Sequence, residues 1–453
     1  MVLSTTTDPS TSRLRLLVLS NGHGEDIIAV RILQELQTWE QPPEIFVLPL
    51  VGEGFAYRHL NIPIIGTVQR MPSGGFIYMD GGKQLIRDVK GGLLQLTWKQ
   101  IQTTRSWVKQ QQINHLQHAV LAVGDIVPLL FAWMSGGNYA FVGTAKSEYY
   151  VRDESGVLQR KEKGAYWENF SGSIYHPWER WLMTRQRCKA VFPRDTLTHD
   201  VLKSMGVPAY DVGNPMMDGL QPSFPTHRVY HSDAEEREMV RPLVFTLLPG
   251  SRPPEAYTNW RTIMVGISTL ISSMGDNKYT AHTSRNLVFL AAIAPGLDCA
   301  PLITTLMEEG WQEISPVTDL PVPLGEKQPL VFQHQQHYLI ISQKAYNDCL
   351  HIGDMAIAMA GTATEQFVGL GKPAFIIPGN GPQFTPRFAE AQTRLLGESV
   401  ILVPQPQDLG EAVRRLLNDP DKLHLISDNG IRRMGKPGAA RRIAEYLMKK
   451  FTC

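Results

Sequence analysis

Short apolar segments bounded by glycine and proline alternate with amphipathic stretches along most of the chain, and this alternation constrains the fold more than any other feature. Each apolar run has the length of one buried strand, and the stretch 27–37 shows helical spacing of its apolar residues. Alternation of this kind builds parallel sheets covered by helices. The predicted strands form two blocks, 14–20, 44–50, 119–124, 139–143, 189–193 and 209–213, and then 242–250, 286–295, 337–342, 354–361, 373–379 and 399–404.

The two blocks predict two domains. A chain of 453 residues is too long for one ordinary domain and fits two of about 200 residues each. The polar segment 222–241, with its prolines and charges, suits an interdomain linker. We therefore predict an α/β protein with two doubly wound Rossmann-like domains, 13–221 and 242–437, and a cleft between them. Ligands of such sheets bind at the carboxyl ends of the strands.

Composition excludes several classes of protein. The 44 basic and 43 acidic residues give a net charge of +1, so nucleic acid is not an expected partner. The four cysteines lack CxxC spacing, which argues against a zinc site and against disulfides, and which fits a reducing cytoplasm. His334 and His337 have no further ligand at metal spacing, so we interpret them as surface histidines before a strand and assign no metal.

Targeting segments are not expected in this chain. The first twelve residues have neither a basic start nor an apolar stretch, so they read as a frayed tail and not as a secretory signal. The most apolar window, 119–137, is interrupted by Gly124, Asp125 and Pro128, and we interpret it as strand, loop and helix. Neither a G-x-S-x-G elbow nor a G-x-x-x-x-G-K-[ST] loop occurs, which argues against a hydrolase triad and a P-loop NTPase.

Three glycine turns each follow a predicted strand and open a predicted helix: SNGHGED (20–26), LPGSR (248–252) and AGTATEQ (360–366). Free backbone N–H groups and the helix dipole favour an anion at such a turn. Arg252 adds a permanently charged guanidinium suited to a diphosphate, and a surface arginine paired with a carboxylate is the alternative. Thr362 and Thr364 are expected N-caps, and Glu365 is placed to accept hydrogen bonds from ribose hydroxyls. The alternative is that these residues form only a capping box.

The first block offers titratable groups at its strand ends. SNGHGED places His23, Glu25 and Asp26 at the end of the first strand, facing the cleft, and simple capping of the helix by His23 and Asp26 is the alternative. Asp125 ends another strand and is a candidate general base for an acceptor hydroxyl, with a buried cap or an arginine partner as the alternative.

Two irregular segments of the first block mix aromatic, glycine and basic residues. Segment 147–189 reads as an insertion between two strands that contacts a membrane surface or packs as an ordinary loop. Its candidate headgroup contacts are Trp178, Arg180, Trp181 and Arg185. Segment 71–101, where glycines break an apolar pattern, suits a mobile flap on the acceptor side.

The order LPGSR, VGNPMMD and AGTATEQ resembles lipid A disaccharide synthase, a two-lobed glycosyltransferase of the GT-B type, and more closely the family related to that synthase. Leu248–Arg252 match L-P-G-S-R throughout, and Val212–Asp218 match V-G-H-P-x-x-D except at Asn214. The resemblance implies a UDP-sugar contact for Arg252. It also aligns Asp26 with the last aspartate of A-G-E-x-S-G-D, and Asp125 with the proposed catalytic aspartate of G-I-D-A-P-D-F.

The sequence departs from the synthase at the third turn. The synthase glutamate of G-T-A-x-L-E falls on Gln366, whereas Glu365 has the spacing of diacylglycerol galactosyltransferases. Segment 381–392 resembles the donor-sugar loop of the peptidoglycan lipid glycosyltransferase, which implies that Gln383 lies near the sugar. His23 lies in a loop similar to those that carry a histidine in those two enzymes, so it competes with Asp125 for the base role. Similar folds also imply that the last helix, in 438–453, packs back on the first domain.

The resemblance implies transfer of a sugar from a UDP-sugar to a lipid or glycolipid acceptor by a cytoplasmic, peripheral membrane enzyme that needs no metal and no cofactor. A UDP-sugar epimerase and a non-catalytic nucleotide-sugar-binding protein are the alternatives. Candidate catalytic residues are Asp125, His23 and Asp26. Candidate donor-binding residues are Gly250, Ser251, Arg252, Gly361, Thr362, Thr364, Glu365, Gln366 and Gln383.

Overall fold

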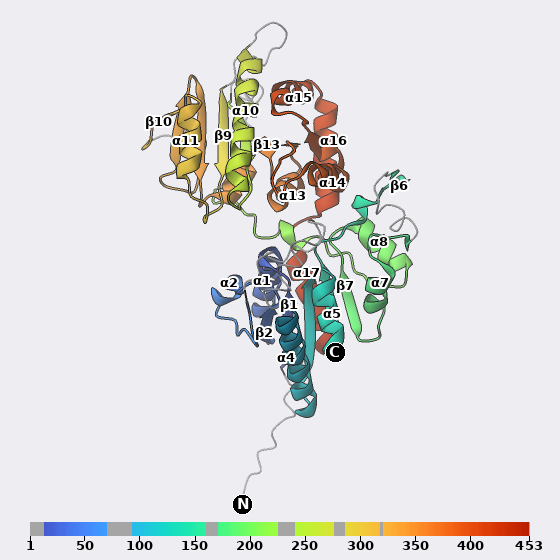
Figure 1. Ribbon diagram of the computed structural model, residues 1–453. Coiled ribbons are helices and arrows are strands. Elements are labelled where there is room, and N and C mark those ends of the chain that lie inside the picture. The colour runs from blue at the N-terminus through green and yellow to red at the C-terminus, as the bar shows by residue number, and fades with distance from the viewer. Residues whose placement is uncertain are drawn as a thin grey trace, which may run out of the picture. The chain divides into compact units, whose positions relative to one another are not determined.

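The computed structural model (Figure 1) describes residues 13–69, 93–159, 171–224, 241–275, 286–317 and 320–452. The chain divides into two compact units, the first made of Met1–Asp218 and Pro437–Cys453 and the second of Gly219–Lys436. Most of the predicted linker 222–241 and of the predicted flap 71–101 lies outside the described residues.

The first unit contains a five-stranded parallel sheet in the order β2-β1-β3-β4-β7. Its strands are β1 (Arg15–Ser20), β2 (Glu44–Pro49), β3 (His118–Gly124), β4 (Tyr139–Gly143) and β7 (Cys188–Phe192). Its helices are α1 (His23–Gln37), α2 (Phe55–Arg58), α4 (Leu93–Ile113), α5 (Ile126–Met134), η1 (Glu148–Tyr150), α7 (Pro177–Met183), α8 (Thr196–Ser204), η2 (Pro215–Met217) and α17 (Ala439–Thr452). A small hairpin joins β5 (Arg152–Asp153) to β6 (Gly156–Val157).

Alternating side chains of β1 show how this sheet is buried on both faces. Leu16 and Val18 pack into a core formed with α1 and α17, whereas Leu17 and Leu19 pack into a core formed with α4 and α5. Successive side chains of a strand point to opposite faces, so a continuous apolar run signals helices on both sides. The last helix, α17, supplies Ile443 to the first of these cores although it is far from β1 in sequence.

The predicted strand 209–213 is wrong. Only Ala209 pairs there, in an isolated bridge with Val191 beside β7. The chain then turns at Gly213, whose φ is 78°, and enters η2 at Pro215, where proline cannot donate a ladder hydrogen bond. Arg442 of α17 donates to the carbonyl of Val212 at 2.9 Å, which holds this segment against the returning helix.

The second unit contains an eight-stranded sheet in the order β10-β11-β12-β9-β8-β13-β14-β15. Its strands are β8 (Leu243–Leu248), β9 (Leu287–Ala292), β10 (Gln312–Glu313), β11 (Leu330–His334), β12 (His337–Ser342), β13 (Met355–Ala358), β14 (Ala374–Ile376) and β15 (Val400–Leu402). Its helices are α10 (Glu255–Gly275), α11 (Ala300–Glu308), α12 (Tyr346–Ile352), α13 (Thr362–Gly369), α14 (Pro386–Leu396), η3 (Gly397–Ser399), η4 (Pro406–Asp408), α15 (Leu409–Leu417) and α16 (Pro420–Met434).

An antiparallel hairpin of β11 and β12, with β10 pairing antiparallel to β11, extends the parallel part of this sheet, and the sequence patterns did not predict it. His334 and His337 face each other where the hairpin turns, and Gln335 between them has a φ of 54°. His337 is buried, and its Nδ1 accepts a hydrogen bond of 3.0 Å from the Leu287 N–H. The interpretation of His337 as a surface residue before a strand is therefore wrong, because it lies inside β12 and joins it to β9.

The chain is anchored on both sides of the boundary between the units. Asp218, the last residue of VGNPMMD, accepts hydrogen bonds from the N–H groups of Gly438 and Ala440 where α17 begins. In the second unit, Asn347 donates to the carbonyls of Gly219 and Gln221, both at 3.0 Å. The last residue of the VGNPMMD motif thus binds the point where the chain leaves the first unit to the point where it re-enters that unit.

Candidate functional site

The strand order of the second unit places two of the glycine turns side by side. Its parallel strands β8, β9, β12, β13, β14 and β15 have the spatial order 3-2-1-4-5-6 when numbered along the chain. The order reverses between β8 and β13, which carry LPGSR and AGTATEQ at their carboxyl ends. Such a switch point is where ligands of open α/β sheets bind, because the connections leave toward opposite faces of the sheet.

The LPGSR loop approaches the next turn closely. Gly250 has a φ of +99°, a conformation that favours glycine, and a Cβ built on it would make an ordinary contact of 3.5 Å with the carbonyl oxygen of Met359. Asn259 of α10 joins the two loops, since its Nδ2 donates to the carbonyls of Pro249 at 3.0 Å and Met359 at 3.3 Å. Ser251 and Arg252 are exposed at the end of the loop.

AGTATEQ opens α13 without a side-chain cap. The N-cap is Gly361, and Thr362 is the first helical residue, so the predicted capping by threonine is wrong. Thr364 is buried, and its hydroxyl donates back to the carbonyl of Ala360 at 2.6 Å. The first N–H groups of a helix have no partner within the helix, so an anion at this turn would meet backbone donors.

Glu365 and Gln366 lie in α13, directly after this turn. The two residues are 7% and 6% exposed, and the hydroxyl of Tyr346 in α12 donates to the Gln366 side-chain oxygen at 2.6 Å. Gln366 is therefore oriented by a neighbouring helix, and Tyr346 is a site residue that the sequence patterns did not indicate.

The loop after β14, residues 377–385, completes the group. Gly379 donates its N–H to the carbonyl of Phe384 at 3.0 Å, which closes the loop. The carboxylate of Glu255 in α10 accepts hydrogen bonds from the N–H groups of Gln383 and Phe384. All predicted donor-binding residues therefore lie on the ends of three adjacent strands, β8, β13 and β14, or on the helices that these ends open.

Two buried amides hold the loops and leave one oxygen each without a hydrogen-bond partner among the described residues. Asn259 is 2% exposed and Gln392 of α14 is 1% exposed. Gln392 donates to the carbonyls of Ala360 and Gly361, both at 3.3 Å, while its Oε1 stays unpaired. Glu255 and Asn259 lie four residues apart on α10, so helical spacing counted from LPGSR could have indicated both as residues facing the site.

The first unit has its own switch point between β1 and β3. There Asn21 and Asp125 follow adjacent strands, and Asn21 Nδ2 donates to Asp125 Oδ1 at 3.1 Å. Asp125 also caps α5, because the same oxygen accepts the Val127 N–H at 2.9 Å. Burial raises the pKa of Asp125, opposed by the Val127 hydrogen bond. A half-buried carboxylate with a raised pKa is a candidate for proton transfer.

Asp26 is more deeply placed than Asp125. It is 3% exposed, its Oδ1 accepts the Ser20 hydroxyl at 2.5 Å, and the Tyr57 hydroxyl donates to Ser20 at 2.7 Å. Burial raises the pKa of Asp26 to about 6. The N-cap of α1 is Gly22, and no side chain caps this helix. Asp26 therefore holds the turn before α1 through its hydrogen bond with Ser20 and not as a cap. The side chain of His23 lies outside the described part of the structure.

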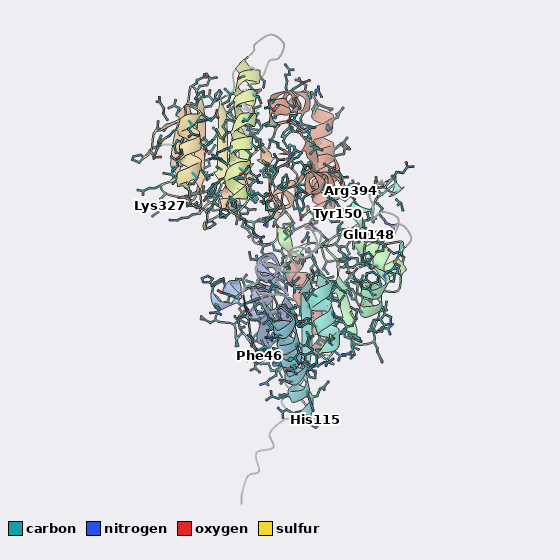
Figure 2. All side chains as sticks on the ribbon, viewed as in Figure 1. Phe46, His115, Glu148, Tyr150, Lys327 and Arg394 are labelled. Atoms are coloured by element: carbon teal, nitrogen blue, oxygen red, sulfur yellow. The ribbon has the colours of Figure 1, made fainter. Side chains whose placement is uncertain are left out.

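The loop after β4 carries a charged network that the sequence patterns did not indicate. Lys146 forms an ion pair of 2.5 Å with the buried Glu179 of α7. Glu148, labelled in Figure 2, is fully buried and accepts from Arg152 at 2.9 Å and from the hydroxyl of Ser173. Burial raises the pKa of Glu148. These contacts tie the loop after β4 to α7 and link described parts of the 147–189 segment to one another.

Two tryptophans of α7 are exposed, Trp178 by 60% and Trp181 by 45%. Trp178 stacks on His176 with ring centroids 4.5 Å apart. Trp181 contacts Trp133 of α5 edge-on at 5.4 Å, and the Arg185 guanidinium lies 4.3 Å from its ring centroid. Each tryptophan therefore contacts a neighbouring ring and still exposes much of its surface, and the Arg185 guanidinium lies beside Trp181.

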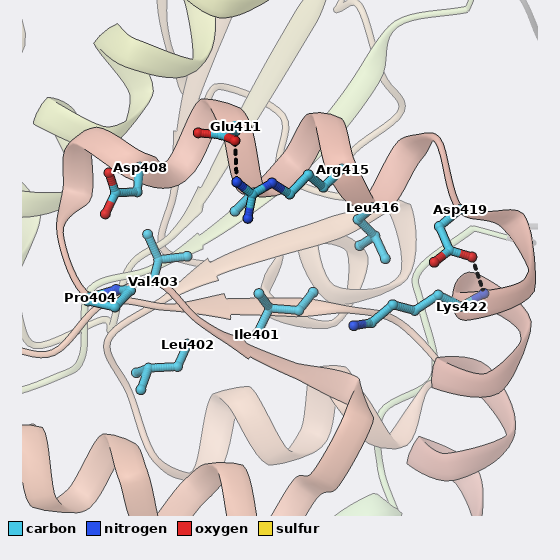
Figure 3. A pocket seen from close by; sticks show the side chains of 11 residues that line it. Ile401, Leu402, Val403, Pro404, Asp408, Glu411, Arg415, Leu416, Asp419 and Lys422 are labelled. Carbon is cyan, nitrogen blue, oxygen red and sulfur yellow. Dashed lines mark hydrogen bonds and ion pairs between the residues drawn. The ribbon is translucent and has the colours of Figure 1, made fainter.

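A hollow of about 550 Å³ lies elsewhere on the second unit, between β15, α15 and α16 (Figure 3). Its lining includes Leu402, Val403 and the ion pair of Glu411 with Arg415. None of the predicted donor-binding residues lines it. Among the described residues, no cluster of three metal-ligating side chains occurs. None of the helices in this part of the chain combines the length and the hydropathy of a membrane span.

The two Rossmann-like α/β units with their parallel sheets define a fold of the GT-B type, and this confirms the fold predicted from the sequence. Three solved structures illustrate the likeness. UDP-GlcNAc 2-epimerase from Neisseria meningitidis bound to UDP-GlcNAc is 14% identical with a TM-score of 0.50, over 96% of this chain and 100% of that one.

MurG of Acinetobacter baumannii is 15% identical with a TM-score of 0.53, over 96% of this chain and 99% of that one. CalG4, the calicheamicin glycosyltransferase, is 14% identical with a TM-score of 0.52, over 97% and 98%. No family model and no curated protein matches the sequence. At these identities the likeness establishes the fold alone.

Proposed function

We propose that this protein is a glycosyltransferase that moves a sugar from a UDP-sugar to a lipid or glycolipid acceptor, as in enzymes related to lipid A disaccharide synthase. The observation that carries the proposal is the pair of loops LPGSR and AGTATEQ on the two strands that flank the switch point of the second sheet. This is where an open α/β sheet binds a nucleotide. The N–H groups of both loops and the Arg252 guanidinium would hold the diphosphate.

The reaction needs one proton acceptor and a stabilised leaving group. The carboxylate of Asp125 takes the proton of the acceptor hydroxyl, whose oxygen then bonds to the anomeric carbon. The bond from that carbon to the phosphate oxygen breaks, and UDP leaves with both electrons of that bond. Arg252 and the α13 N-terminus stabilise the charge on UDP, so the reaction needs neither metal nor cofactor. His23 is the alternative base.

Calorimetric titration with UDP and a panel of UDP-sugars tests the donor site. We expect micromolar binding with a preference for one sugar, weakened about ten- to a hundredfold by Arg252→Ala, since a hydrogen bond to a charged group contributes about 1.5–3 kcal/mol. Arg415→Ala, on α15 of the same unit and away from these loops, is the matched control. Absence of binding to every uridine nucleotide would contradict the proposal.

We also propose that the enzyme works at the inner face of a membrane, in contact through the surface formed by Trp178, Trp181 and Arg185. Exposed tryptophan beside arginine suits the headgroup region of a bilayer. Flotation with anionic liposomes should recover the wild type and lose the double variant Trp178→Ala and Trp181→Ala. Trp39→Ala, at another exposed tryptophan, is the control. Equal recovery of wild type and double variant in the soluble fraction would contradict this contact.

A UDP-sugar epimerase is the second candidate, because the fold is shared with a UDP-GlcNAc 2-epimerase. An epimerase changes the donor itself, so NMR of the UDP-sugar after incubation without acceptor separates the two reactions. Release of an epimer would favour the epimerase over the transferase. Donor binding without any turnover across an acceptor panel would favour a non-catalytic binding protein.

A further inference from the structure

The first turn of α10 holds the loop after β14 through one carboxylate. Glu255 is 7% exposed, and its Oε1 accepts the Phe384 N–H at 2.7 Å and the Gln383 N–H at 3.1 Å. Its Oε2 lies 3.2 Å from the Gln383 nitrogen, so this N–H is shared between both oxygens. We call this contact of the Glu255 carboxylate with the N–H groups of Gln383 and Phe384 the clamp, and it joins segments that are more than 120 residues apart in sequence.

The packing around this clamp is close. A Cβ built on Gly381 would lie 2.3 Å from Glu255 Oε1, and one built on Gly379 would lie 3.1 Å from Asn259 Oδ1. Glycine at both positions lets the loop backbone lie against the two α10 side chains. The position of this loop is therefore set by the same helix turn that follows Arg252, where the Ala256 N–H bonds to the Arg252 carbonyl at 2.9 Å.

The chemistry of the clamp limits what the loop can bind. The carboxylate already uses the N–H groups of Gln383 and Phe384, and it adds a negative charge beneath the loop. A phosphate next to this loop would therefore find neither of these two backbone donors free. Neutral hydroxyl groups do not need them, because they pair with side-chain amides such as that of Gln383.

We propose that Glu255 is a positioning residue for the sugar half of the donor. It fixes the 379–385 loop beside the diphosphate loops, so that the loop contacts sugar hydroxyls and the extra affinity of the UDP-sugar over UDP depends on the clamp. The proposal rests on the proposed function, since it assumes that the second unit binds a UDP-sugar.

The test compares Glu255→Gln with Glu411→Gln, an exposed ion-paired glutamate of α15 in the same unit. Glutamine keeps the shape of Glu255 but replaces one accepting oxygen with an NH₂ group that opposes a backbone N–H. Affinities for UDP and for the preferred UDP-sugar are measured by calorimetry, and hydrogen–deuterium exchange of peptides covering 379–385 reports on the loop without ligand. Thermal unfolding of both variants checks the fold.

We expect Glu255→Gln to weaken UDP-sugar binding about tenfold while leaving UDP binding within about twofold, and to speed exchange in 379–385. Glu411→Gln should match the wild type in both assays. Unchanged UDP-sugar affinity would overturn the proposal, and so would an equal loss for UDP and UDP-sugar, which would assign the loop to the nucleotide. A wild type that binds neither compound would refute the proposed function itself, and this inference with it.

Discussion

Replacing Asp26 by asparagine should change how the stability of the first unit depends on pH. Asp26 is 3% exposed, and its carboxyl oxygen accepts the Ser20 hydroxyl, which in turn accepts the Tyr57 hydroxyl. Burial disfavours the charged form more than these hydrogen bonds favour it, so the pKa is raised to about 6 from 3.8. Asparagine keeps the shape and the accepting oxygen but cannot ionise.

The sign follows from comparing the folded and unfolded states. A carboxyl whose pKa is higher in the folded protein binds its proton more tightly there, so its contribution to stability is full below pH 3.8. That contribution is lost as the pH rises through about 6. A shift of about two pKa units corresponds to about 3 kcal/mol. Between pH 4 and pH 8, Asp26→Asn should therefore gain about 3 kcal/mol relative to the wild type.

The assay is hydrogen–deuterium exchange of peptides from β1, corrected for the intrinsic pH dependence of exchange, because it reports on the first unit separately from the second. Asp211→Asn, at an exposed carboxylate of the same unit that accepts the Thr196 hydroxyl, is the control. Opening free energies of wild type and Asp26→Asn that run parallel from pH 4 to pH 8 would refute the reasoning, since they would show no ionisation penalty at Asp26.

Three further changes test the site and its support. Asp125→Asn should slow sugar transfer by at least about a hundredfold and leave UDP affinity unchanged, because an amide cannot take the proton from the hydroxyl of the acceptor. Transfer at the wild-type rate would assign the base role to His23 instead. Asp218→Ala should lower the free energy of unfolding by about 1–3 kcal/mol in urea titrations, because the N–H groups of Gly438 and Ala440 lose their acceptor. Leu447→Ala in α17 should cost about 2–5 kcal/mol by leaving a cavity against α1, and a smaller loss would show that this helix packs loosely.

Strand positions were predictable because burial of a parallel strand on both faces leaves a local signal. Leu16 to Leu19 are all apolar and all buried, and the runs that became β8 and β13 read in the same way. Segment 209–213 misled because Ala209 and Val212 are buried beside the sheet, but only Ala209 pairs with it, in an isolated bridge. The β11–β12 hairpin was missed because the apolar run of β11 is only three residues long, Leu330 to Phe332, and polar residues separate it from β12.

The sequence by itself determined most of the succession of strands and helices and the places of the three glycine turns, since apolar periodicity and glycine turns are properties of neighbouring residues. The tertiary structure decided which loops lie together, because strand order is set by long-range pairing and brings β8 beside β13 across more than 100 residues. It also decided the clamp of Glu255 on Phe384 and the raised pKa of Asp26. Both depend on burial and on partners that only the folded chain brings within hydrogen-bonding distance.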